Sequence, residues 1–232
     1  RMAVLAIPGI AAGDDLRRAA DLGVDVLRVG IDIPRSAEAA PLLALSRRLG
    51  FETHASLLKA SLADAGGFAR HARAMAGEGA QHVGLYDSAG ALLPAQVAAM
   101  LGAARAALPG GIGLAFHGHD NLGLAVANTL AALEAGAASL DCTLAGAGRS
   151  AGNAPTETVL LAARRAGHAL AGDFAALGRL AEAEILPLFG PIAGTPEDAA
   201  MGFAGLHSDG LALVRRVAAR RGLPVLALLQ AL

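Results

Sequence analysis

Aromatic residues and cysteine are scarce in this sequence. Tryptophan is absent, and Phe, Tyr and Trp together make up 3% of the 232 residues. That scarcity argues against a surface on which nucleic-acid bases or sugars stack. Cys142 is the single cysteine, so these residues form no disulfide among themselves, and we expect its thiol to serve as a small buried side chain.

Net charge and long apolar runs are also missing. The 19 Lys and Arg residues nearly balance the 20 Asp and Glu residues, so neither nucleic acid nor an anionic membrane is expected as a partner. No uninterrupted apolar run of about 18 residues occurs, and no secretory signal pattern opens the sequence. Hydrophobic residues nevertheless make up 54% of the chain. These features favour a cytoplasmic protein with a large buried core.

Short apolar segments alternate with helical patterns over about the first 170 residues. The expected strands are 2–8, 24–31, 51–58, 82–86, 112–116 and 139–144. The expected helices are 14–22, 36–49, 63–78, 94–107, 122–135 and 156–167. Such alternation, without Asn-Gly hairpin signals, predicts a parallel sheet of the α/β class, with its chemistry at the carboxyl ends of the strands.

The chain shows six strand–helix units, whereas a complete (β/α)8 barrel has eight units and roughly 250 residues. Beyond residue 172 only helical patterns occur, over 174–188, 208–221 and 224–232, with three prolines marking a turn after the first. We therefore expect a barrel domain over 1–172 and a small C-terminal helical domain over 173–232.

The strongest chemical signal is His117-Gly118-His119 at the end of the fifth expected strand. Side chains alternate along a strand, so both imidazoles point the same way and can share one divalent metal ion. A histidine pair alone leaves a purely structural role open.

Polar residues also end the neighbouring segments. Asp87 and Ser88 follow the fourth strand, where they either bind a substrate or cap a helix. Residues 146–153 form a glycine-rich loop that either closes over a ligand, with Asn153 offering an amide oxygen to a metal, or lies on the surface. The loop does not match the glycine pattern of a dinucleotide site. His207 stands at a helix start, where capping is the simplest role.

Four other histidines carry weaker signals. His71 and His168 lie in helical patterns and are expected in solvent, whereas His54 lies in the third strand and could face the barrel interior. His82 opens the fourth strand.

The sequence from His117 to Glu157 resembles the metallolyase superfamily of HMG-CoA lyase, and within it the 4-hydroxy-2-oxovalerate aldolases of aromatic and sterol degradation. The shared residues are His117, His119, Asn121, Val126-Ala127-Asn128, Gly136, Asp141 and the stretch 144–157. Three further segments are similar to family segments, so the resemblance covers nearly the whole chain: 5–10, 87–90 and 202–205.

The resemblance implies a TIM barrel and a class II aldolase that needs Mn²⁺ or Mg²⁺. His117, His119 and Asn153 would be the metal ligands, and Ser88 and His117 would contact a 2-keto acid substrate. The metal would act as a Lewis acid while a 4-hydroxy-2-oxoacid is cleaved to pyruvate and an aldehyde. His207 aligns with a family tyrosine and is expected to take part in proton transfer.

The resemblance also implies a partner and marks a gap. The family pairs with an acylating acetaldehyde dehydrogenase, here through residues 173–232, and an oligomer is expected.

No Arg-Asp-Gly segment occurs in this sequence, so we expect the first two barrel strands to be absent from this chain. Two alternatives stay open: a non-catalytic barrel partner of an aldehyde dehydrogenase, and an acyl-CoA lyase or synthase of the same superfamily. The second is disfavoured because the loop lacks the cysteine-bearing insertion of HMG-CoA lyases.

Overall fold

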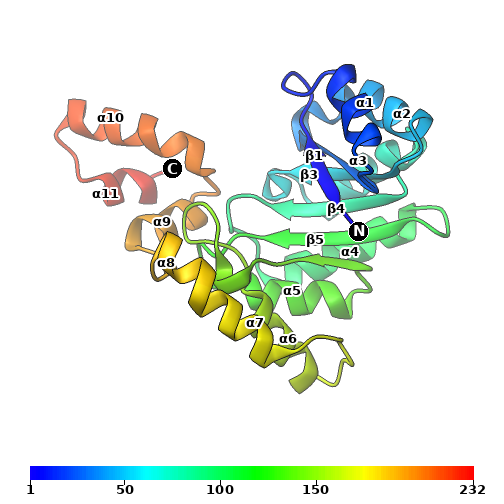
Figure 1. The fold of residues 1–232 in the computed structure, drawn as a ribbon. Coiled ribbons are helices and arrows are strands. Elements are labelled where there is room, and N and C mark those ends of the chain that lie inside the picture. Colours follow the sequence, from blue (N-terminus) through cyan, green and yellow to red (C-terminus); the bar gives the residue numbers. More distant parts are fainter. The chain divides into compact units, whose positions relative to one another are not determined.

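The computed structural model describes all of residues 1–232, and strands alternate with helices along the chain (Figure 1). The strands are β1 (Ala3–Ala6), β2 (Val26–Asp32), β3 (Glu52–Leu58), β4 (His82–Asp87), β5 (Gly113–Gly118) and β6 (Ser139–Asp141). The helices that follow them are α1 (Gly13–Asp21), α2 (Ala40–Arg48), α3 (Ala65–Gly77), α4 (Pro94–Ala107), α5 (Ala125–Glu134) and α6 (Thr156–Arg165).

Only helices follow α6. They are α7 (Phe174–Leu180), the π-helical turn η4 (Ala181–Ile185), α8 (Leu186–Phe189), α9 (Pro196–Phe203), the 3₁₀ turn η5 (Ser208–Gly210), α10 (Leu211–Arg221) and α11 (Val225–Gln230). Three of these helices share a small core of Met201, Val214 and Leu229. No helix in the structure has both the length and the apolar character needed to cross a bilayer.

The six strands form one sheet whose spatial order follows the chain order from β1 to β6. The first four strands pair in parallel, with Ala3 opposite Val26 and His54 opposite His82. A sheet that adds each new strand on the same side is the pattern of a (β/α) barrel, whereas doubly wound sheets reverse their order. The predicted α/β fold with six barrel units is therefore confirmed.

Burial explains why these segments form strands. Val29, Leu57 and Val83 are fully buried on their strands, and each such side chain contributes about 1.5–3 kcal/mol through removal from water. Hydroxyl groups buried beside them are paired in the 2.6 Å hydrogen bond between Ser46 and Thr53.

The chain divides into two compact units, which are described separately below. The first consists of Arg1–Tyr86, Ala98–Phe116 and Ala135–Ser139, and the second of Asp87–Val97, His117–Glu134 and Leu140–Leu232. The domain division expected at residue 172 stays a prediction.

Three local expectations were wrong. The helix expected from residue 36 begins instead as a 3₁₀ turn, η1 (Ile33–Ala39), and the Ser36 hydroxyl lies 2.8 Å from His71 Nδ1. The His71 side chain is therefore partly buried and has a hydrogen-bond partner, whereas it was expected in solvent. Helix α9 fills part of the expected proline-marked turn, because Thr195 and Asp198 form a capping box around Pro196.

Candidate metal and substrate site

The histidine pair lies at the carboxyl end of β5, in the second unit. His117 is the penultimate residue of the strand and His119 follows its end. Their rings meet edge to face with centroids 5.1 Å apart. His119 is 8% exposed, so its imidazole is available only to a ligand that enters the protein interior.

The glycine-rich loop folds back onto this strand end. Asn153 forms an antiparallel bridge with His119, and the Asp120 amide donates to the Gly152 carbonyl at 3.0 Å. Gly152 and Asn153 are buried. The loop therefore packs against the strand end at His119, whereas its tip, residues 148–150, is exposed. Closure of the loop over a ligand stays a prediction.

Two loop glycines are required by close contacts. A Cβ atom on Gly148 would lie 2.4 Å from the Asn153 side-chain nitrogen. Gly152 has φ +88°, and a Cβ there would lie 2.4 Å from the Gly146 carbonyl oxygen. Both contacts are shorter than real carbon contacts, so larger residues would push the loop away from His119.

Two buried polar atoms in this region have no hydrogen-bond partner: His119 Nδ1 and Asn153 Oδ1. The Asn153 amide is oriented because its nitrogen donates to the Ala147 carbonyl at 3.0 Å. Leaving such atoms unsatisfied costs about 1–3 kcal/mol each, so native structures normally give them a partner. An imidazole nitrogen and an amide oxygen are both suitable ligands for a divalent ion. The residues present therefore fit the metal that the family resemblance implies.

The charge state of His119 also suits metal binding. Burial lowers the pKa of this imidazole, and the nearby charge of Arg149 lowers it further. Backbone hydrogen bonds with Arg149 and Gly152 oppose this shift. A lowered pKa favours the neutral imidazole, which is the form that binds metals.

Asp87 has a structural role. Its buried carboxylate accepts hydrogen bonds from the backbone amides of Ala91 (3.0 Å) and Leu92 (2.9 Å). Burial raises the pKa of this carboxyl, although these amides oppose the rise. These amides belong to the turn between β4 and α4, which begins only at Pro94, so Asp87 orders that turn and does not cap the helix. Ser88 follows it, half-buried, and its contact with substrate stays a prediction.

Asn121 joins the loop to helix α9. Its side-chain nitrogen donates to the Ser150 hydroxyl at 2.9 Å and to the Asp198 carbonyl at 3.1 Å. The Ser150 hydroxyl donates in turn to the Asp198 carboxylate at 2.5 Å. Sequence reasoning missed Asp198, whose only local signal is its capping position three residues after Thr195.

His207 lies in a polar cluster at the start of η5. Its Nδ1 is 2.8 Å from the Asp209 carboxylate, and its Nε2 is 3.1 Å from the Arg149 guanidinium. His207 is also the capping residue of η5, so the simplest role is observed. Its part in proton transfer stays a prediction. Arg149, on the glycine-rich loop, was not expected from the sequence.

A second histidine cluster lies in the first unit. Glu52, His54 and His82 place their ligand atoms within 4.8 Å of one another, in an arrangement that could hold a metal ion. This cluster was not predicted, because it depends on the register between β3 and β4.

Consecutive parallel strands with candidate site residues at their carboxyl ends are typical of α/β barrels. Such barrels build their sites from the loops that follow the strands. The HMGL-like family matches residues 15–183. The chain therefore belongs to the HMGL-like family.

Known proteins show the same relationship. A curated relative from Alkalilimnicola ehrlichii, named 4-hydroxy-2-oxovalerate aldolase, is 38% identical over 225 residues, which are 97% of this chain and 66% of the relative. The N-terminal domain of a candidate aldolase from Bacteroides vulgatus has a TM-score of 0.78 at 23% identity, over 96% of this chain and 76% of that one. HMG-CoA lyase from Brucella melitensis has a TM-score of 0.68 at 22% identity, over 78% and 72%.

The chain spans about two thirds of the length of the curated relatives, between 64% and 66% for the first three. The six observed strands thus form part of a barrel, and the predicted family resemblance is confirmed.

Proposed function

We propose that this chain carries the metal-binding part of a divalent-metal-dependent aldolase that cleaves a 4-hydroxy-2-oxoacid to pyruvate and an aldehyde. The observation that carries the proposal is the pair of buried, unpartnered atoms His119 Nδ1 and Asn153 Oδ1, with the His117 ring next to that of His119. The name of the relative from Alkalilimnicola ehrlichii supports the choice of substrate.

His117, His119 and Asn153 would hold the ion, and Mn²⁺ or Mg²⁺ suits this mixture of nitrogen and oxygen ligands. When bound, the ion supplies Lewis-acid stabilisation of the negative charge that develops on the 2-keto oxygen. Asn153 is held for this role by Ala147, and Gly148 leaves room for its amide.

The remaining residues handle the substrate and its protons. The Ser88 hydroxyl donates to the substrate carboxylate. A base takes the 4-hydroxyl proton, the C3–C4 bond breaks, and the aldehyde leaves. The electron pair of that bond passes to the C2–C3 unit, and the resulting enolate of pyruvate takes up one proton at C3. His207, held between Arg149 and Asp209, is the residue that we assign to proton transfer.

The partner and the cellular setting are part of the same proposal. Residues 173–232 would dock an acylating acetaldehyde dehydrogenase, and the exposed apolar side chains of Leu188, Phe189 and Phe203 support a docking role for this segment. We also propose an oligomer in the cytoplasm that serves the breakdown of aromatic compounds.

One observation favours the non-catalytic alternative. His207 replaces the tyrosine that the family is expected to use, and it is engaged by Asp209 and Arg149. A barrel that only supports an aldehyde dehydrogenase would keep the fold without releasing pyruvate.

The test is pyruvate release from 4-hydroxy-2-oxopentanoate with added Mn²⁺, using the protein as its gene encodes it. We expect metal-dependent pyruvate and a loss of at least about 100-fold in His117→Ala, because a metal ligand is removed. His168→Ala, which changes a histidine outside the site, should keep full activity. A folded, Mn²⁺-loaded protein that releases no pyruvate would overturn the aldolase assignment.

A further inference from the structure

The geometry of a second cluster, far from the histidine pair in sequence, supports an inference of its own. Glu52 and His54 are two residues apart on β3, so both side chains project from one side of the strand. His82 is the first residue of β4 and lies directly opposite His54 in the parallel register. Register and alternation together gather two imidazoles and a carboxylate at the amino ends of two neighbouring strands.

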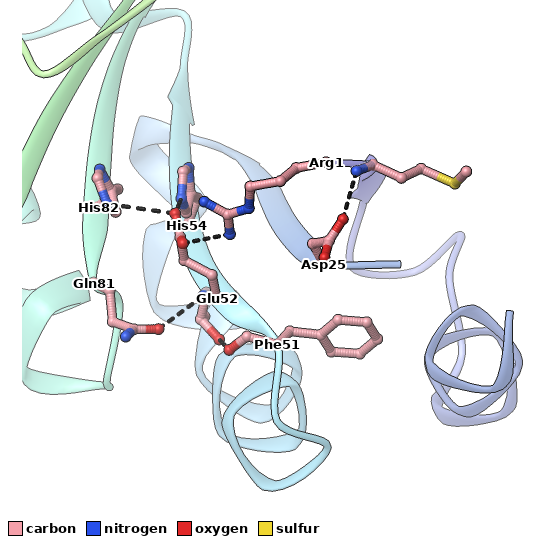
Figure 2. Close-up of polar contacts among 9 residues, drawn as sticks. Arg1, Asp25, Phe51, Glu52, His54, Gln81 and His82 are labelled. Atoms are coloured by element: carbon pink, nitrogen blue, oxygen red, sulfur yellow. Dashed lines mark hydrogen bonds and ion pairs between the residues drawn. The ribbon is translucent and has the colours of Figure 1, made fainter. Parts of the chain in front are cut away.

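The two imidazoles approach the same oxygen of the Glu52 carboxylate, as Figure 2 shows. His54 Nε2 lies 2.7 Å from Glu52 Oε1, and His82 Nε2 lies 3.5 Å from the same oxygen. The two rings are stacked, with centroids 4.2 Å apart and an interplanar angle of 22°. A tetrahedral shell with bonds of 2.0–2.1 Å sets ligand atoms about 3.4 Å apart, which is close to the 3.5 Å between His82 Nε2 and Glu52 Oε1.

The hydrogen bonding within the cluster is incomplete at His82. Its Nδ1 is buried without a partner, and the 3.5 Å separation of its Nε2 from Glu52 is long for a hydrogen bond. The Arg1 guanidinium is 2.5 Å from Glu52 Oε2, so it engages the oxygen that faces away from the imidazoles. Glu52 Oε1 is thereby the oxygen that faces the Nε2 atoms of both imidazoles.

We infer that Glu52, His54 and His82 bind a divalent transition metal ion of the Zn²⁺ type. Imidazole and carboxylate groups suit Zn²⁺, and three protein ligands leave one position for water. Such an ion would bridge the amino ends of β3 and β4. All three ligands belong to the first unit and the proposed aldolase ligands to the second, so the two sites share no residue.

Zn²⁺ titration by calorimetry, at neutral pH on metal-free protein, tests this inference. The variant His117→Ala/His119→Ala removes the proposed aldolase site and should still bind one Zn²⁺. Adding His54→Gln and His82→Gln to that variant should abolish the remaining binding. Glutamine is chosen because its amide can still donate to Glu52 and preserve the fold.

Controls separate this site from the aldolase site and from misfolding. His168→Gln in the same background should leave Zn²⁺ binding unchanged, and Glu52→Gln should weaken it by about 10-fold or more. Co²⁺ in place of Zn²⁺ should give visible absorption bands that vanish with the two glutamine substitutions. Failure of the aldolase assay would leave these results unaffected. Zn²⁺ binding that survives the glutamine substitutions, or that is absent from the folded His117→Ala/His119→Ala variant, would overturn the inference.

Discussion

Glu52 carries its charge in a setting that strongly favours the ionised form. The hydrogen bond from His54, followed by that from Arg1, lowers the pKa of this carboxyl from its ordinary value of 4.5 to about 2. His54 responds in the opposite sense to its surroundings, since burial lowers the pKa of its imidazole although Glu52 opposes that shift. The pKa values of Glu52 and His54 thus depend on contacts among residues of β3, β4 and the first residue of the chain.

A consequence at the residue scale concerns acid stability. A carboxyl whose pKa is lower in the folded than in the unfolded state stabilises the fold above pH 4.5, and that contribution is lost as the pH falls toward 2. Glu52→Gln should therefore flatten the fall in unfolding free energy across this pH interval. Urea unfolding in a chelating buffer at several pH values measures it. An equally steep fall in the variant would show that Glu52 does not carry the effect.

At the scale of elements, the loop between β6 and α6 decides the shape of the candidate metal site. Its backbone bonds hold Asn153 against His119, and Asn121 ties the same loop to α9 through Ser150. Because side-chain hydrogen bonds link the loop to α9, a change in one is expected to alter the other.

The loop provides a prediction with a matched control. In Gly148→Ala the new methyl group collides with the Asn153 amide, so Mn²⁺ affinity should fall by about 10–100-fold. Gly102→Ala, on the exposed side of α4 with open space around it, should leave Mn²⁺ affinity unchanged and stabilise the helix by about 0.5–1 kcal/mol. Equal Mn²⁺ affinities in both variants would show that Asn153 does not contribute to metal binding.

The alternation of strands and helices was predictable from sequence because glycines end many of the helices and the strands are short apolar runs. Helix α4 begins and ends at the expected residues, and Pro94 explains its start. Helix α9 was missed because eight residues, opened by a proline and acidic residues, resemble a turn. The Glu52–His82 cluster was missed because pairing between strands is not encoded in local spacing.

At the scale of the whole molecule, the described chain holds six consecutive strands of a barrel. In barrels of this class the site is assembled from loops after several strands. Here the loops after β4, β5 and β6 contribute Ser88, His119 and Asn153 as candidates. The family resemblance located these residues in the sequence, whereas the structure adds the buried, unpartnered atoms of His119 and Asn153.

The central claim is that His117, His119 and Asn153 form one site for Mn²⁺. Electron paramagnetic resonance tests it directly, because free Mn²⁺ gives a sharp six-line signal that weakens when the ion is bound. We predict that the protein removes this signal stoichiometrically, and that Asn153→Ala and His119→Ala weaken binding by about 10-fold or more. Binding that is equally tight in all three proteins would contradict the claim.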